Sequence, residues 1–158
     1  MDIIVPKKGE ISGVIVTPLR RIPDERGSIF HCVKRSELNY DLAEVYFKKL
    51  YANVINGWHL HQTMTLNYTT FLGTTKLVVC DLREKSDTFG NLMEFYCGED
   101  NYCRVLIPPG VANASQCVGG PLSMFANTPD KEHDPSLKYE RIDPFNGRIK
   151  YQWFERHY

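Results

Sequence analysis

The sequence predicts an all-β fold, either an antiparallel sandwich or a barrel, with one or two short helices. The first observation is a succession of short β-branched and aromatic runs, each bounded by turn residues. The second is their close, repeated spacing, which is typical of antiparallel sheets. The third is that one segment alone, 36–45, is a plausible helix. The strand-like runs are 13–18, 27–33, 68–73, 75–83, 91–98, 103–110 and 121–127.

Two local signals define elements in the first half of the chain. Ser36 is a suitable N-cap for the short helix over 36–45. Gly73, which is followed by two threonines, separates two strand-like runs. Because a glycine between such runs is typical of a tight turn, we expect a hairpin over 66–81 with its turn near Gly73.

The second half contains fewer clear signals. Residues 81–90, DLREKSDTFG, predict a strand that runs into a turn, with Arg83 pairing with acidic neighbours. The segment 128–143 is rich in Pro, Asp and Lys, so we expect a loop on the surface there. A last strand is expected around 149–153.

Length and composition limit the class of protein. The 158 residues are enough for one domain over 1–158 with a core of its own. The 19 Lys and Arg residues balance the 19 Asp and Glu residues, so we expect neither nucleic acid nor an anionic membrane as a partner. No apolar stretch has membrane-spanning length and the start lacks a secretory apolar region, which predicts a soluble, cytoplasmic protein. Five singly placed cysteines indicate reduced thiols rather than disulfides or a zinc site.

Residues 57–62, GWHLHQ, place two histidines one residue apart in a strand-like stretch. On a strand, His59 and His61 point to one side, and Trp58 and Leu60 to the other. Two imidazoles on one face are often half of a metal site. They can equally pack in a barrel wall, or His59 can act as a general base, since imidazole titrates near neutral pH.

This part of the sequence resembles the metal-binding motif of cupin proteins in the spacing of its residues, but two of the residues at metal-ligand positions differ. Leu66 stands at the carboxylate position and Asn113 at that of the third histidine. Two of four ligands are therefore absent, and a protein metal site needs at least three donors. We expect no metal. A metal-dependent cupin enzyme stays an alternative that requires a further ligand.

The chain as a whole resembles the nucleotide-sugar epimerases of the cupin superfamily, the dTDP-4-dehydrorhamnose 3,5-epimerase family. The resemblance covers residues 11 to 143 and rests on motifs in family order, namely DERGSIF at 24–30, GWH at 57–59, DLREKSDTFG at 81–90, IPPGVAN at 107–113 and IDP at 142–144. It implies a cupin-type double-stranded β-helix, that is, a jelly-roll barrel. It also implies a homodimer that exchanges edge strands, and no cofactor.

The resemblance also implies roles for three residues. The histidine of the family's Gly-x-His motif is the catalytic base, and it corresponds to His59. A late aspartate that pairs with this base corresponds to Asp143. The arginine that holds the nucleotide's phosphates corresponds to Arg26. The proton-accepting side of the family's reaction is therefore present in the sequence.

Four positions depart from the family pattern. Asn56 replaces an arginine, and Leu66 replaces a lysine that stabilises the enolate oxygen. Met124 falls at the tyrosine that acts as general acid, and Asn113 at an additional histidine. If Leu66 faces the lumen, alternation places Tyr68 on the same face, which makes Tyr68 a candidate catalytic substitute for the tyrosine. The candidate substrate contacts are Arg26, His61, Asn113, Asn56 and Met124.

These residues predict an isomerase that inverts C3 and/or C5 of a 4-keto nucleotide-diphospho-sugar, in deoxysugar or surface-polysaccharide biosynthesis. The C4 ketone acidifies the neighbouring C–H bonds, so that His59 can remove a proton and an acid can return one to the opposite face. A non-catalytic sugar or nucleotide-sugar binding cupin is the alternative that Leu66, Met124 and Asn113 favour.

Overall fold

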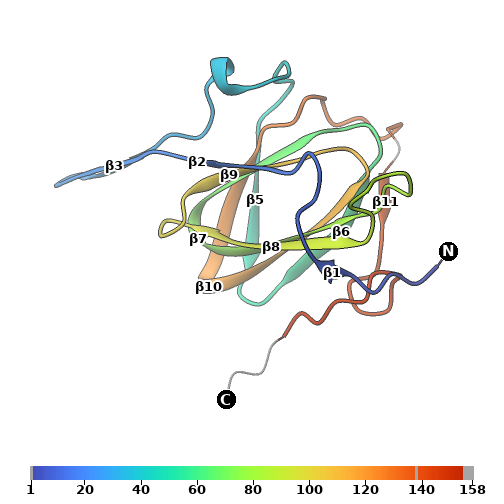
Figure 1. Cartoon of the computed structure of the whole chain (residues 1–158). Coiled ribbons are helices and arrows are strands. Elements are labelled where there is room, and N and C mark those ends of the chain that lie inside the picture. Colours follow the sequence, from blue (N-terminus) through green and yellow to red (C-terminus); the bar gives the residue numbers. More distant parts are fainter. Residues whose placement is uncertain (1, 138, 155–158) are drawn as a thin grey trace.

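The computed structural model of the chain describes residues 2–137 and 139–154. Nine of the strands in these residues form one sheet with the order β1-β8-β7-β10-β6-β11, in which β5 also pairs with β10, and β9 joins β7 to β2. β3 and β4 form a separate hairpin that projects from one side of the barrel (Figure 1). The strands are β1 Lys7–Lys8, β2 Ile15–Pro18, β3 Arg21–Asp24, β4 Gly27–Phe30, β5 Tyr46–Tyr51, β6 Ile55–His61, β7 Leu66–Asp81, β8 Asn91–Gly98, β9 Cys103–Ile107, β10 Val111–Asn127 and β11 Tyr139–Arg141.

The two longest strands, β7 and β10, hold the barrel together. They pair antiparallel from Val111 opposite Asp81 to Asn127 opposite Tyr68. On its other side, β10 pairs first with β6 and then with β5, while β7 pairs first with β9 and then with β8. The strands wrap around a common interior, as Figure 1 shows, and the predicted all-β jelly-roll barrel is confirmed.

The predicted hairpin over 66–81 is wrong, because β7 continues through Gly73 without reversing. Gly73 has φ +66, and a Cβ atom there would lie 2.3 Å from the carbonyl oxygen of Leu122. The glycine therefore adopts a backbone conformation that other residues rarely tolerate, at a point where β10 passes very close. The register of β7 with β10 also shifts there, between Cys117 and Met124. The glycine that was interpreted as a turn therefore lies at a register shift within one long strand, β7.

The segment predicted as a helix, 36–45, is not helical. Only a short 3-10 turn, Arg35–Glu37, forms there, and Ser36 lies within this turn rather than capping a helix. The next part of the segment bonds to the loop after β10, where the hydroxyl of Tyr40 donates to the carbonyl oxygen of Thr128. Tertiary contacts thus replace the local helical hydrogen bonds. The intrinsic helix propensity of this segment is weak, so such contacts are enough to override it.

Neighbouring residues of β7 supply two separate parts of the core. Leu77 and Val79 pack into one cluster, and Val78 and Cys80 into another. Alternate residues of a strand face opposite sides, so β7 is covered on both faces, which explains its unbroken apolar run. The second cluster also contains Trp58, Leu60, Ile149 and Trp153.

The segment 128–143, which was predicted to be a surface loop, contains a strand, β11. β11 pairs antiparallel with β6, with Arg141 opposite His59. The strand predicted around 149–153 is wrong, because Ile149 forms only a single bridge, with Ile4. Because β11 pairs with β6, it covers the edge of the sheet beside that strand.

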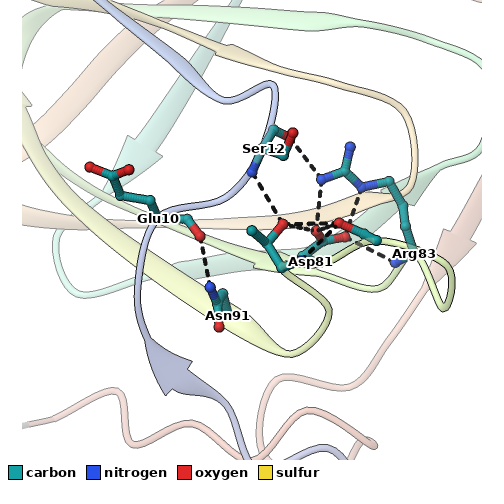
Figure 2. A network of polar contacts seen from close by, with 7 residues as sticks. Glu10, Ser12, Asp81, Arg83 and Asn91 are labelled. Carbon is teal, nitrogen blue, oxygen red and sulfur yellow. Dashed lines mark hydrogen bonds and ion pairs between the residues drawn. The ribbon is translucent and has the colours of Figure 1, made fainter.

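Asp81 ends β7 and anchors both the following turn and the N-terminal segment (Figure 2). Its fully buried carboxylate accepts hydrogen bonds from the Arg83 guanidinium at 2.7 and 2.8 Å and from the hydroxyls of Ser86 at 2.7 Å and Thr88 at 2.6 Å. Arg83 also donates to the backbone oxygen of Ser12 at 2.8 Å. Burial alone would raise the pKa of Asp81, but the hydrogen bonds lower it to about 2. The predicted pairing of Arg83 with an acidic neighbour is confirmed.

No helix within residues 2–137 and 139–154 is long and apolar enough to cross a bilayer. All five cysteines are free thiols, and four of them are buried. The expectation of unpaired, mostly buried cysteines is therefore confirmed.

Candidate active site

A cavity of about 250 Å³ lies between β5, β6, β10 and the segment that leads into β11. Histidine, tyrosine and cationic side chains dominate its polar lining, and Asp134 is the one carboxylate that the described residues, 2–137 and 139–154, contribute to it. Asp134 accepts a hydrogen bond from the backbone N–H of Ser136 at 2.8 Å. The cavity therefore suits an anionic ligand. Its polar lining consists of His59, His61, His133, Tyr46, Tyr68, Tyr139, Lys48, Arg141, Asn56 and Asp134.

The two histidines of GWHLHQ project from β6 into this cavity. Trp58 and Leu60, which alternate with them, are buried in the core on the other side of the strand. The predicted orientation of His59 and His61 toward one face is confirmed, and the strand period explains it.

Tyr139 is the polar partner of the His59 ring. The tyrosine hydroxyl forms a short hydrogen bond with Nδ1 of His59. The same phenol oxygen accepts a hydrogen bond from Nε of Arg141 at 3.0 Å. The antiparallel pairing of β11 with β6 creates this arrangement, because it places Tyr139 opposite His61 and Arg141 opposite His59.

The surroundings keep His59 neutral. Burial is the main reason that the pKa of His59 falls from 6.5 to about 4, and the nearby charges of Arg141, His61 and Lys48 lower it further. Burial also lowers the pKa of His61, with a smaller contribution from His133. Both imidazoles are therefore unprotonated at neutral pH and can accept a proton.

The predicted pair of His59 with Asp143 does not form in this structure. The Oδ1 atom of Asp143 accepts hydrogen bonds from the backbone N–H groups of Phe145 and Asn146, both at 2.8 Å, and these bonds lower the pKa of Asp143. Among the residues that the structure describes, no hydrogen bond joins Asp143 to His59. The reason is local, since Asp143 begins an exposed turn directly after β11 and its carboxylate caps that turn.

Tyr68 lines the cavity, and the buried Asn113 is its hydrogen-bond partner. The Tyr68 hydroxyl donates to Oδ1 of Asn113 at 3.2 Å, and the side-chain amide of Asn113 donates to the backbone oxygen of His59 at 3.1 Å. Burial raises the pKa of Tyr68 well above its usual value, so its hydroxyl stays protonated. Asn113 is 1% exposed and does not line the cavity, so the predicted sugar contact by Asn113 is not supported. Asn56 does line the cavity, as predicted.

Two predicted positions lie outside the cavity. Leu66 is buried in the apolar core, and Met124 faces away from the lumen. Phe125, the next residue, lines the cavity and packs against Tyr68, with ring centroids 4.7 Å apart. Since successive residues of a strand face opposite sides, Phe125 rather than Met124 contributes to the cavity, and the predicted substrate contact by Met124 is not supported.

Arg26 lies at the turn of the β3–β4 hairpin. Its guanidinium donates to the carboxylate of Asp24 at 2.7 Å, and its side chain is 81% exposed. It does not line the cavity of its own chain. The predicted contact of Arg26 with phosphate stays a prediction.

The sequence interpretation missed six polar residues of the cavity, namely Tyr46, Lys48, His133, Asp134, Tyr139 and Arg141. Tyr46 and Lys48 alternate with outward-facing residues on β5, and this period-2 pattern was a usable signal beside the mistaken helix. Tyr139 and Arg141 lie in a segment whose charged, proline-rich composition resembled a loop. No local pattern distinguished them.

Among residues 2–137 and 139–154, no three His, Cys, Asp or Glu side chains are grouped so that they can hold a metal ion. His59 and His61 share the cavity with His133, but the polar groups that act on His59 include the phenol of Tyr139 and the cations Arg141 and Lys48. Cations repel a metal ion, so the donor set here fits proton transfer better than metal binding.

The jelly-roll barrel with a polar cavity in its lumen defines a protein of the cupin fold. Residues 8–157 match the family model described as dTDP-4-dehydrorhamnose 3,5-epimerase. The chain belongs to this family of nucleotide-sugar epimerases, as its motifs indicated.

Two relatives and one solved structure extend this finding. The chain is 32% identical to the spore coat polysaccharide biosynthesis protein SpsL of Bacillus subtilis, over 90% of this chain and 96% of the relative. It is 29% identical to a probable low-salt glycan biosynthesis epimerase of Haloferax volcanii, over 89% and 88% of the two chains. The crystal structure of a dTDP sugar isomerase from Desulfovibrio desulfuricans superimposes with a TM-score of 0.86 at 29% identity, and covers 90% of this chain and 92% of that one.

Proposed function

We propose that the protein is a nucleotide-sugar epimerase that inverts C3 and/or C5 of a 4-keto nucleotide-diphospho-sugar. The observation that carries the proposal is a neutral imidazole, His59, inside the polar cavity of a chain that belongs to an epimerase family. The C4 ketone of such a sugar makes the neighbouring C–H bonds acidic enough for an imidazole to remove the proton. The reaction needs no metal or other cofactor.

Lys48 is the proposed donor to the enolate oxygen. Removal of the proton leaves negative charge on the ketone oxygen, and a positioned cation in a water-poor site stabilises that charge strongly. Lys48 lines the cavity and is close enough to His59 to lower its pKa. None of the ion pairs within the described part of the chain involves Lys48, so its ammonium group is available.

Tyr68 is the proposed acid that returns a proton to the opposite face of the sugar. Its hydroxyl stays protonated because burial raises its pKa, and it reaches the cavity from β7, whereas His59 reaches it from β6. Phe125 beside it has no proton to give. The proposed acid therefore lies on a different strand from the one that the family resemblance implied.

The diphosphate is expected near Arg141 and near Arg26 of a second copy. Arg26 is exposed on a projecting hairpin and cannot serve the cavity of its own chain as the structure stands. A homodimer in which each hairpin reaches the neighbouring cavity accounts for both facts. The two named relatives support a place in surface-polysaccharide or glycan biosynthesis, and the proposed enzyme works in the cytoplasm, where nucleotide sugars are its substrates.

Deuterium exchange tests the proposed reaction. The protein is incubated with 4-keto nucleotide-diphospho-sugars in deuterated water, and C3 and C5 are followed by NMR. We expect exchange with at least one of these sugars, and a loss on the order of 100-fold or more in His59→Gln. His31→Gln is the matched control, because His31 lies outside the cavity. No exchange with any sugar, or unchanged exchange in His59→Gln, would contradict the proposal.

Mixing of two inactive variants tests the shared site. Arg26→Ala and His59→Gln are each expected to lack activity, but in a mixed dimer one of the two cavities has both an intact base and an intact arginine. We therefore expect partial recovery when the two variants are unfolded and refolded together. A monomer in sedimentation analysis, or no recovery in a confirmed mixed dimer, would refute the composite site.

A non-catalytic binding module is the second candidate, and the aromatic Phe125 in the lumen favours it, since its ring offers a contact surface but no proton donor. That function predicts calorimetric binding of nucleotide sugars without any deuterium exchange.

A further inference from the structure

β11 supplies the hydrogen-bond partner of Nδ1 of His59. The Tyr139 hydroxyl bonds to this nitrogen, and Arg141 donates to the same phenol oxygen at 3.0 Å. The rings of His59 and Tyr139 are stacked, with an interplanar angle of 18° and centroids 5.7 Å apart. Tyr139 also packs against His61, with ring centroids 4.8 Å apart. Hydrogen bonding and stacking together fix the plane of the His59 ring.

We propose that Tyr139 is the positioning residue of His59 and takes the place that a carboxylate has in a histidine–carboxylate pair. This inference rests on the proposed function. A histidine that accepts a proton at Nε2 must carry its own hydrogen on Nδ1, and that hydrogen needs an acceptor. The phenol oxygen of Tyr139 is the acceptor within reach.

Arg141 holds the phenol oxygen of Tyr139 in the position that accepts the hydrogen bond from His59. A phenol oxygen has two acceptor sites and one hydrogen. Arg141 donates to one site, and in the proposed tautomer Nδ1–H of His59 donates to the other. Tyr139 is 42% exposed, so its own hydrogen has access to water. All hydrogen-bonding groups are thus satisfied in the tautomer that leaves Nε2 free toward the cavity.

A neutral partner has a chemical consequence. A carboxylate both orients a histidine and stabilises its protonated form, whereas a phenol only orients it. The charges that act on the pKa of His59 are those of Arg141 on β11, Lys48 on β5 and His61 on its own strand, and each of them disfavours an imidazolium; the carboxylate of Asp134 and the groups of His133, Tyr46 and Tyr68 also line the cavity. His59 is therefore a weak base. It suits a substrate whose C–H bond is already acidified, such as the carbon beside a ketone.

The hydroxyl of Tyr139 can be removed without changing its ring. In Tyr139→Phe, we expect kcat for deuterium exchange to fall on the order of 10- to 100-fold with little change in KM, because the base is present but no longer aligned. Tyr96→Phe is the matched control, since Tyr96 is an exposed tyrosine outside the cavity. Far-ultraviolet circular dichroism and the melting temperature show whether each variant is folded.

Nitrogen NMR detects the hydrogen bond between His59 and Tyr139 without any substrate. Long-range ¹H–¹⁵N spectra of the histidine rings identify which ring nitrogen carries the hydrogen. We expect His59 to carry it on Nδ1 at pH 7 in the unmodified protein, and to lose this preference in Tyr139→Phe but not in Tyr96→Phe. Hydrogen on Nε2 in the unmodified protein, or identical spectra in the unmodified protein and Tyr139→Phe, would overturn the inference.

A carboxylate at position 139 tests the neutral-partner argument. In Tyr139→Glu, the titration midpoint of His59 followed by NMR is expected to rise by at least one pH unit, because the new charge stabilises the imidazolium. An unchanged or lower midpoint in a folded variant would show that residue 139 does not control His59. The NMR results stand even if no sugar exchanges deuterium, so failure of the proposed function is distinguishable from failure of this inference.

Discussion

The hydroxyl of Tyr68 donates a hydrogen bond to Oδ1 of Asn113 at 3.2 Å. The amide of Asn113 donates in turn to the backbone oxygen of His59, so one asparagine connects the proposed acid to the strand that carries the proposed base. Asn113 is buried and links Tyr68 to β6, at the position where the family resemblance implied a histidine. Tyr68 is thereby held at a defined distance from His59.

Tyr68→Phe is expected to separate proton removal from inversion. His59 and Lys48 are unchanged in this variant. The rate of deuterium exchange at the carbon from which His59 removes the proton should therefore stay within a few-fold of the rate in the unmodified protein. Formation of the inverted sugar should fall by about 100-fold or more, because no acid serves the opposite face. Both quantities are read by NMR in a single sample in deuterated water.

Tyr46→Phe is the control for this prediction. Its hydroxyl also belongs to the cavity, but it accepts a hydrogen bond from the side-chain amide of Asn127 at 2.8 Å. Normal inversion is expected without it. If inversion is lost in Tyr46→Phe and retained in Tyr68→Phe, the acid has been assigned to the wrong tyrosine.

Lys48→Met is expected to lower kcat by about 100- to 1,000-fold with a small effect on KM, as the loss of one oxyanion donor does in other enzymes. Lys49→Met is the matched control, because Lys49 is the next residue on β5 and is exposed on the opposite face. The measurement is steady-state epimerisation at several substrate concentrations. Equal effects of the two substitutions would mean that Lys48 contributes only general positive charge.

Much of the fold was predictable because it depends on local periodicity. The alternation in GWHLHQ placed His59 and His61 in the lumen and Trp58 in the core, and both placements are correct. Gly73 shows the limit of such signals. Its positive φ was foreseeable from the residue type, but whether the chain reverses or continues there depends on β10, which lies about 40 residues away in the sequence.

The candidate site was less predictable, because long-range register decides which residues meet. The identification of His59 needed only its own motif. Its partner depends on how β11 aligns with β6, because Tyr139 and Asp143 are four residues apart along the chain and the register decides which of them lies beside His59. The choice between Met124 and Phe125 depended on a single residue of alignment, which reverses the face of a strand.

Acid is expected to destabilise the protein through His59. The pKa of His59 is about 4 in the folded protein and near 6.5 when it is unfolded, so between these values the unfolded chain binds more protons. Stability therefore rises with pH across this window and is lost as the pH falls. Between pH 7 and pH 5 the contribution of this one residue is about 2 kcal/mol.

Urea unfolding at the two pH values measures this contribution. His59→Asn should lose about 2 kcal/mol less than the unmodified protein between pH 7 and pH 5. Parallel losses in both proteins would mean that His59 titrates normally. In the active protein, the same low pKa should keep kcat/KM high down to about pH 5, well below the limit for an ordinary histidine.

Asp81→Asn is expected to destabilise the fold by about 3 kcal/mol without impairing catalysis. The substitution keeps the size of the side chain but leaves the Arg83 guanidinium and two hydroxyl donors without their charged acceptor. Asp87→Asn, at an exposed position in the same turn, is the control. Urea unfolding at pH 7 gives the difference in free energy. The exchange rate per folded molecule should be unchanged, because the network does not line the cavity.

The pH dependence of this difference identifies its origin. The pKa of Asp81 is lowered to about 2 from 3.8, so its stabilising effect is complete above pH 3.8 and disappears as the pH falls toward 2. The gap between the unmodified protein and Asp81→Asn should therefore narrow below about pH 3. A gap that stays constant down to pH 2 would show that the cost comes from altered packing of the amide. In that case the charge of Asp81 is not what attaches the N-terminal segment at Ser12 to the barrel.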